Sequence, residues 1–142
     1  MTFTKAFIAI FCVLFVHAVA IIFHLYGLWH WFDIPMHYSG GLAMGLLGLA
    51  IWQQGIAEVK FKGWLAKHLE WWLVPLFLIG FVAFVGIGWE MYEFVMDQWF
   101  TEVIDGVYQF LRQPSLADTM LDFAMDLLGG ASVAVFVLIK RL

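Results

Sequence analysis

Charged side chains and cysteines are scarce in this sequence. Only 13% of its 142 residues are charged, whereas 64% are hydrophobic and 19% are aromatic, and the mean hydropathy is +0.91. A water-soluble domain of this size needs more charged residues on its surface. The composition therefore predicts an integral membrane protein. The single cysteine, Cys12, excludes a disulfide within the chain. A net charge of -4 argues against nucleic-acid binding.

Long apolar runs fill most of the chain. A helix needs about 20 residues to cross roughly 30 Å of hydrocarbon. Four runs reach that length, at about residues 6–28, 35–53, 71–92 and 116–139. We therefore expect an all-α, polytopic membrane protein in which residues 1–142 form one bundle of four transmembrane helices. A cleaved signal peptide is the alternative for the first run, because HAVA at 17–20 resembles a cleavage site, but the apolar run continues past it.

Basic residues are distributed unequally over the two sides that four spans define. The side that holds both ends of the chain carries six of the seven, and the other side carries only Arg112. Because cytoplasmic loops are enriched in Lys and Arg, this predicts a bacterial-type inner-membrane protein with both termini in the cytoplasm. Between the third and fourth spans, QWFTEVIDGVYQFLRQ has apolar residues at helical spacing, which predicts a short interfacial helix on the outer leaflet.

Acidic residues gather in one half of the predicted bilayer. Seven of the eleven Asp and Glu residues lie in or at the ends of spans, and the predicted topology places all seven in the outer half. They recur at i, i+3 and i+7 on the third span and at i, i+4 and i+8 on the fourth, so each set shares one helix face. Only the outermost acid of the third span, Asp97, is expected to be solvated. The seven are Asp33, Glu90, Glu93, Asp97, Asp118, Asp122 and Asp126.

The segment WFDIPMHYSGG places His37 one turn deeper than Asp33 on the second span. We expect these two side chains to form one wall of an outward-facing polar pocket. No span interior contains Lys or Arg, so the buried acids need protons, histidine, water or a metal ion as partners. Carboxylates together with histidine suit a divalent cation such as Mn, Fe, Zn or Mg. The expected ligands are Asp33, His37, Glu90, Glu93, Asp122 and Asp126, with Asp118 and His24 as further candidates.

Simpler structural roles are open to several of these residues. Asp33 can cap the second helix, and Ser115 with Asp118 has the spacing of a capping box. His17 and His24, seven residues apart on one face of the first span, are compatible with structural hydrogen bonds as well as with a ligand role. The four deeper acids of the third and fourth spans lie too deep for caps, which favours a functional role for them.

The acidic motifs resemble a known family. The order FDIPMHYSGG, GWEMYEF and ADTMLDFAMDLLGG is similar to the YjdF-type family of uncharacterised bacterial inner-membrane proteins, over roughly residues 32–131. The family positions fall on Asp33, His37, Glu90, Glu93, Asp118, Asp122 and Gly129. That family has more spans before its first motif and is apolar at Asp126, where this chain is instead similar to the last helix of VanZ-like membrane proteins. Either resemblance implies a small helical membrane bundle and supplies no established reaction.

Three functions are compatible with this sequence, and whether the protein is an enzyme is left open. The first is a divalent-metal site that hydrolyses a lipid or envelope precursor, with Glu93 or Asp122 as general base. The second is a proton or cation relay, although four spans are few and the inner half shows no matching polar path. The third is a structural accessory subunit whose pocket holds a pigment, a haem or a partner helix. The expected partners are the lipid bilayer and a second copy or a larger membrane complex.

Overall fold

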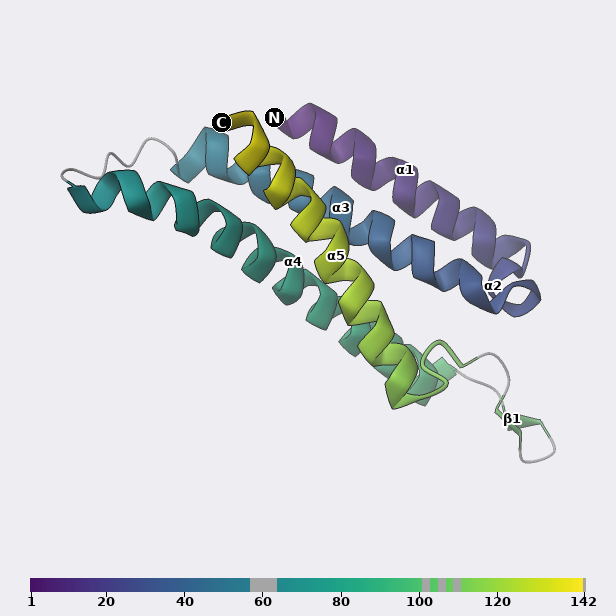
Figure 1. Ribbon diagram of the computed structural model, residues 1–142. Coiled ribbons are helices and arrows are strands. Elements are labelled where there is room, and N and C mark those ends of the chain that lie inside the picture. Colours follow the sequence, from purple (N-terminus) through teal and green to yellow (C-terminus); the bar gives the residue numbers. More distant parts are fainter. Residues whose placement is uncertain (57–63, 101–102, 105–106, 109–110, 142) are drawn as a thin grey trace.

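The computed structural model describes residues 1–56, 64–100, 103–104, 107–108 and 111–141. Four long helices dominate this part of the chain (Figure 1). They are α1 (Phe3–Ile22), α3 (Asp33–Ile51), α4 (Trp64–Phe100) and α5 (Leu116–Arg141). The segments long and apolar enough to cross a membrane are Phe3–Ile22, His30–Ile56, Trp71–Phe100 and Leu116–Lys140. The prediction of an all-α bundle of four membrane-spanning helices is confirmed.

The first span is shorter than predicted because the chain turns sharply after α1. Two short elements lie between α1 and α3: α2 (Leu25–Leu28) and the 3-10 helix η1 (His30–Phe32). The π-helix η2 (Trp52–Ile56) follows α3. Between α1 and α2, His24 has a φ of 53°, in the left-handed region. This residue interrupts the helical periodicity, so the prediction that His17 and His24 share a helix face is wrong.

The connection between α4 and α5 also differs from the prediction. Val103–Ile104 (β1) and Val107–Tyr108 (β2) pair antiparallel, with Ile104 opposite Val107, so these residues are not helical. Much of the remaining predicted interfacial helix lies outside the described residues. Valine and isoleucine favour strands, and an Asp-Gly pair between two apolar pairs is a strong hairpin signal in a sequence. Strand pairing of these four residues therefore replaces the helix that the apolar spacing predicted.

Helix α3 occupies the centre of the bundle. It packs against α1, α4 and α5, and α4 also packs against α5. Helix α1 also reaches α4 through the edge-to-face contact of His17 with Trp89, and the two chain ends lie at the same end of the bundle (Figure 1). An even number of spans requires this arrangement of the ends, while their cytoplasmic location stays a prediction. We call the other end of the bundle, where α3 and α5 begin, the outer end.

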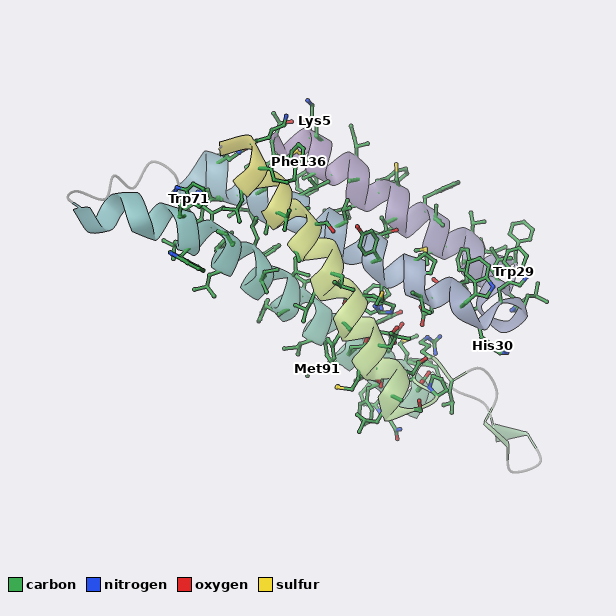
Figure 2. All side chains as sticks on the ribbon, viewed as in Figure 1. Lys5, Trp29, His30, Trp71, Met91 and Phe136 are labelled. Carbon is green, nitrogen blue, oxygen red and sulfur yellow. The ribbon has the colours of Figure 1, made fainter. Side chains whose placement is uncertain are left out.

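Aromatic side chains lie near both ends of the bundle. Trp71 lies toward the end that carries Lys5, and Trp29 lies with His30 at the outer end (Figure 2). Trp72 and Phe84, both on α4, are among the most exposed large apolar side chains, at 78% and 76%. Tryptophans near two interfaces and apolar side chains on the outside of the helices are typical of a protein surrounded by lipid.

Glycines bring α3 and α5 into close contact at the level of the acids. A Cβ atom on Gly41 would collide with the backbone of Asp126, and one on Gly129 would collide with the backbone carbonyl of Tyr38. Further inward, a Cβ on Gly45 would lie 3.0 Å from a methyl carbon of Val133. The absence of side chains at these glycines is therefore what allows α3 and α5 to approach so closely.

We expect Gly129→Ala to destabilise the bundle by about 1–3 kcal/mol, because the added methyl group forces two backbones apart. Gly80→Ala on α4 is the matched control, since nothing lies within 4 Å of a Cβ built there, and alanine is the better helix former. Thermal unfolding of both variants in the same detergent measures the difference. Equal unfolding temperatures for the two variants would contradict the close α3–α5 contact.

Candidate functional site

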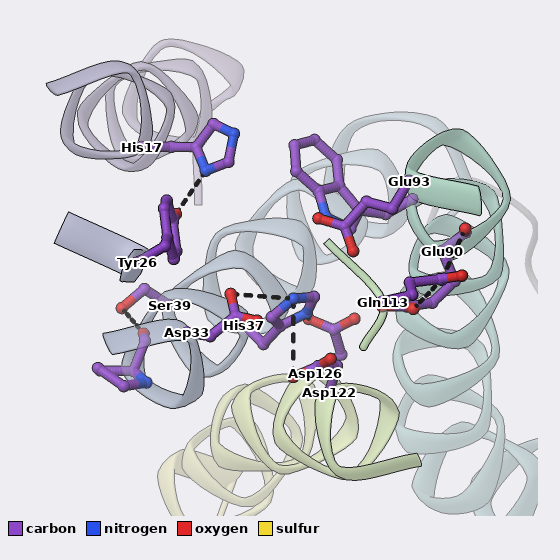
Figure 3. Close-up of polar contacts among 12 residues, drawn as sticks. His17, Tyr26, Asp33, His37, Ser39, Glu90, Glu93, Gln113, Asp122 and Asp126 are labelled. Carbon is purple, nitrogen blue, oxygen red and sulfur yellow. Dashed lines mark hydrogen bonds and ion pairs between the residues drawn. The ribbon is translucent and has the colours of Figure 1, made fainter. Parts of the chain in front are cut away.

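His37 is the centre of a buried polar cluster formed by α3, α4 and α5 (Figure 3). Its Nε2 atom lies 3.6 Å from Oδ1 of Asp33, which precedes it by one turn on α3, and 3.8 Å from Oδ1 of Asp122 on α5. Its Nδ1 atom lies 3.5 Å from Oδ1 of Asp126, also on α5. Both ring nitrogens of a histidine that is only 6% exposed therefore face carboxylates.

Helix α4 contributes two buried glutamates to this cluster. Oε2 of Glu90 accepts a hydrogen bond of 2.6 Å from the side-chain amide of Gln113. Oε1 of Glu93 accepts one of 3.0 Å from the indole N–H of Trp89. One ligand atom of each glutamate and one ring nitrogen of His37 lie within 4.8 Å of one another, and the same holds for the group of Asp33, His37 and Asp122. Both groups have the compactness of a metal-ligand set.

Three carboxylates of the cluster keep an oxygen without a partner among the described residues. These buried atoms are Oε1 of Glu90, Oε2 of Glu93 and Oδ2 of Asp122, and Oδ2 of Asp118 is a fourth. A buried acceptor left without a hydrogen bond costs about 1–3 kcal/mol, and more when it is charged. Their convergence around one histidine indicates a site that needs protons, water or a cation for its remaining oxygens.

A side-chain helix cap is observed at the start of α5 but not at the start of α3. Phe32 occupies the N-cap of α3, and Asp33 lies in the first turn with its carboxylate toward His37, so the capping alternative for Asp33 is wrong. At the start of α5, Oγ of Ser115 accepts a hydrogen bond of 3.2 Å from the backbone N–H of Asp118. That contact confirms Ser115 as a cap and places Asp118 in the first turn of α5.

Two other polar residues lie differently from the expectation. His24 is exposed at the turn after α1 and belongs to neither of the groups with metal-ligand spacing among the described residues. Asp97, expected to be solvated, is buried and accepts hydrogen bonds of 2.8 to 3.0 Å from the backbone N–H groups of Arg112 and Gln113. It also pairs with the Arg112 guanidinium at 3.1 Å. Asp97 thereby holds Gln113 against Glu90, a role that the sequence did not indicate.

A cavity of about 110 Å³ adjoins the cluster, between α1, α3 and α4. Four acid-cluster residues reach it: Asp33, His37, Glu93 and Asp126. From the N-terminal part of the chain, His17 and Tyr26 also line it, with 2.6 Å between Nδ1 of the imidazole and the phenol oxygen. Burial raises the pKa of the Tyr26 hydroxyl, so this group keeps its proton. The contribution of α1 to the cavity was not expected, because the sequence placed the pocket among the other three spans.

The model of the family described as "Predicted membrane protein (DUF2238)" matches residues 2–141, which include every residue of the acid cluster. No curated protein and no solved structure matches the chain. The finer resemblances to YjdF-type and VanZ-like proteins stay predictions. Because the match covers nearly the whole sequence, the chain belongs to the DUF2238 family of predicted membrane proteins.

Proposed function

We propose that His37 and the carboxylates around it bind a divalent metal ion. The observation that carries this proposal is the set of partnerless oxygens on Glu90, Glu93 and Asp122, all buried beside one histidine. The span interiors contain no Lys or Arg that could neutralise them. A divalent cation compensates two negative charges and accepts several oxygen ligands at once, which suits such a cluster better than water does.

The orientation of the His37 ring favours metal binding through Nε2. We propose that Nδ1 carries the ring proton and donates a hydrogen bond to Asp126. This leaves Nε2 unprotonated toward Asp33 and Asp122. Atoms bound to one metal at about 2.0–2.2 Å lie roughly 3 to 3.6 Å apart. The observed separations of 3.6 and 3.8 Å need only a small contraction to reach that range. We therefore assign these three residues as ligands and Asp126 as the residue that orients the ring.

Helix α4 supplies the remaining acids of the proposed site. Glu90 and Glu93 form the second group with metal-ligand spacing around His37. One imidazole among several carboxylates favours manganese, iron, zinc or magnesium over soft copper(I). Asp118 stays a candidate outer ligand, because one of its buried oxygens has no partner among the described residues.

Hydrolysis of a lipid or an envelope precursor is the reaction class that we propose for this site. A bound cation makes a water molecule nucleophilic at neutral pH, and a neighbouring carboxylate can accept its proton. Of the two bases suggested by the sequence, Glu93 lines the cavity and Asp122 does not. The buried Oε2 atom of Glu93 also has no hydrogen-bond partner among the described residues. We therefore assign Glu93 as the general base.

A proton or cation relay is less well supported by the packing of the bundle. Beyond the acid cluster, toward the end that holds both termini, buried apolar residues of α3, α4 and α5 pack together, and the buried polar side chains of the described residues all lie nearer the outer end. The members of this apolar cluster are Leu49, Trp52, Val74, Leu78, Val133, Ala134 and Val137. A relay needs polar groups or water across the whole hydrocarbon layer, and this apolar cluster interrupts such a path.

Equilibrium dialysis of chelator-treated protein against Mn²⁺, Zn²⁺ or Mg²⁺ tests the metal site. We expect saturable uptake of about one equivalent of at least one of these ions, and uptake should fall as the pH is lowered, because protons compete for carboxylate and imidazole ligands. His24→Gln serves as a control in which a histidine outside the cluster is removed. If neither these three ions nor Fe²⁺ is taken up saturably in lipid nanodiscs, the proposal is wrong.

A further inference from the structure

A second hollow lies at the end of the bundle that holds both chain ends, away from the acid cluster. Its volume is about 450 Å³. Lys5 and Phe136 lie at that end (Figure 2), on two helices, α1 and α5, that both pack against α3. We call this hollow the α1–α5 groove, and its lining includes Lys5, Leu46, Leu49, Phe136, Val137 and Lys140.

The α1–α5 groove has an apolar floor and a fixed wall. Leu49 of α3 and Val137 of α5 belong to the buried apolar packing of the bundle, and both also line the groove. On the wall, the side-chain amide of Gln54 donates a hydrogen bond of 3.2 Å to the backbone carbonyl of Met1. The amino group of Met1 donates to Oε1 of Gln53. The start of the chain is therefore held against the end of α3.

The rim of the groove is positively charged. Lys5 and Lys140 are exposed and both line it, and no Asp or Glu is among the lining residues that the structure describes. The Nζ atom of Lys140 lies 4.8 Å from the centre of the Phe136 ring, a cation–π contact that keeps this ammonium group at the rim. Two cations above an apolar floor complement a ligand that is both anionic and amphiphilic.

A membrane lipid satisfies both parts of the groove at once. A free phosphate ion would use only the two lysines, and a hydrocarbon chain alone would use only the floor. The groove lies toward the same end of the bundle as Trp71 (Figure 2), and indole side chains prefer the interface between hydrocarbon and water. Phosphate groups of the surrounding lipids therefore lie at about the level of the lysines. Basic pockets between membrane helices at this level are suited to anionic head groups.

We propose that the α1–α5 groove binds the head group of an anionic phospholipid, with its phosphate between Lys5 and Lys140. The glycerol unit lies on the floor at Leu46 and Leu49, and the acyl chains stay in the bilayer. The groove therefore needs to hold only the polar part of the lipid, and its volume lies within the range of about 300–1,000 Å³ that is usual for ligand pockets. This site does not rest on the metal site proposed at His37.

Native mass spectrometry of the detergent-purified protein, titrated with phosphatidylglycerol or with phosphatidylcholine, tests this proposal. We expect phosphatidylglycerol to bind at least about tenfold more tightly than phosphatidylcholine. Lys5→Ala/Lys140→Ala should weaken the binding of phosphatidylglycerol by at least about tenfold, because each lysine near an anionic lipid contributes to the affinity. Lys5→Arg/Lys140→Arg keeps both charges and should bind phosphatidylglycerol within about threefold of the wild type.

A second pair of variants changes the shape of the groove without a change in charge. Phe136→Ala removes one apolar wall and the ring beneath Lys140, so it should weaken the binding of phosphatidylglycerol several-fold. Val135→Ala shortens the neighbouring exposed side chain, which is outside the described lining, and should leave binding unchanged.

Three results would overturn the proposal. They are equal affinity for the two lipids, unchanged binding of phosphatidylglycerol after Lys5→Ala/Lys140→Ala, and displacement of the lipid by inorganic phosphate at a comparable concentration. The last result would show that the groove recognises a free anion and that its apolar floor contributes nothing. Metal uptake, measured on the same samples, should be equal in the wild type and in the lysine variants, so that the lipid site and the metal site are tested separately.

Discussion

Metal-free protein is expected to become substantially more stable when a divalent cation is added. A ligand at a hundred times its dissociation constant stabilises the folded state by about 2.7 kcal/mol, and here it would also neutralise carboxylates whose buried oxygens have no partner among the described residues. The double variant Glu93→Gln/Asp122→Asn should lose this response. Thermal unfolding in detergent, with and without Mn²⁺ or Zn²⁺, measures both proteins under the same conditions.

In the absence of metal, we expect the same double substitution to raise the stability of the protein. Replacing two buried carboxylates by amides of nearly the same shape removes charges that the apolar surroundings disfavour. We therefore expect the metal-free variant to unfold at a higher temperature than the metal-free wild type. A site built only for structural hydrogen bonds would behave otherwise, since amides would then weaken the metal-free protein and a cation would stabilise neither form.

Graded losses of metal affinity are expected from substitutions at the two sides of the His37 ring. His37→Gln removes the proposed nitrogen ligand and should weaken binding by at least about 100-fold. Asp126→Asn alters only the group that orients the ring, so it should weaken binding by roughly 10- to 100-fold, the usual range for an outer-shell partner. Competition with a chelating dye gives the dissociation constants.

His24→Gln is the matched control for this series, because His24 lies at the exposed turn after α1. Its metal affinity should equal that of the wild type. If Asp126→Asn abolishes binding as completely as His37→Gln does, Asp126 is itself a ligand, as the sequence suggested. If neither substitution changes the affinity, the cation is not bound at His37.

The sequence predicted the features that depend on span length and helical periodicity. The four apolar runs fixed the number of membrane helices, and the spacing of Glu90, Glu93, Asp122 and Asp126 placed these acids on inward faces where the structure buries them. The i, i+4 spacing likewise brought Asp33 beside His37. A histidine in a Gly-rich span together with acids on two other spans is sufficient to predict one shared cluster.

The features that the sequence missed depend on contacts between distant segments or on local backbone conformation. Nothing in the sequence indicates that Gln113 donates to Glu90, because the pairing follows from the way Asp97 holds the end of the connecting segment. The turn at His24, whose backbone is left-handed, lies within an apolar run. Hydropathy alone does not indicate where such a run turns. The two strands after α4 were missed because the prediction there followed the helical spacing of the apolar residues, although the same segment contains an Asp-Gly pair.

Elemental analysis by mass spectrometry, on protein purified without chelators, tests the central claim most directly. The wild type should carry about one equivalent of a divalent transition metal or magnesium per chain, and the Glu93→Gln/Asp122→Asn variant, purified in parallel, should carry almost none. A wild type without metal above the buffer background, even after incubation with each ion, would contradict a metal site at His37. Equal metal content in the two proteins would contradict it as well.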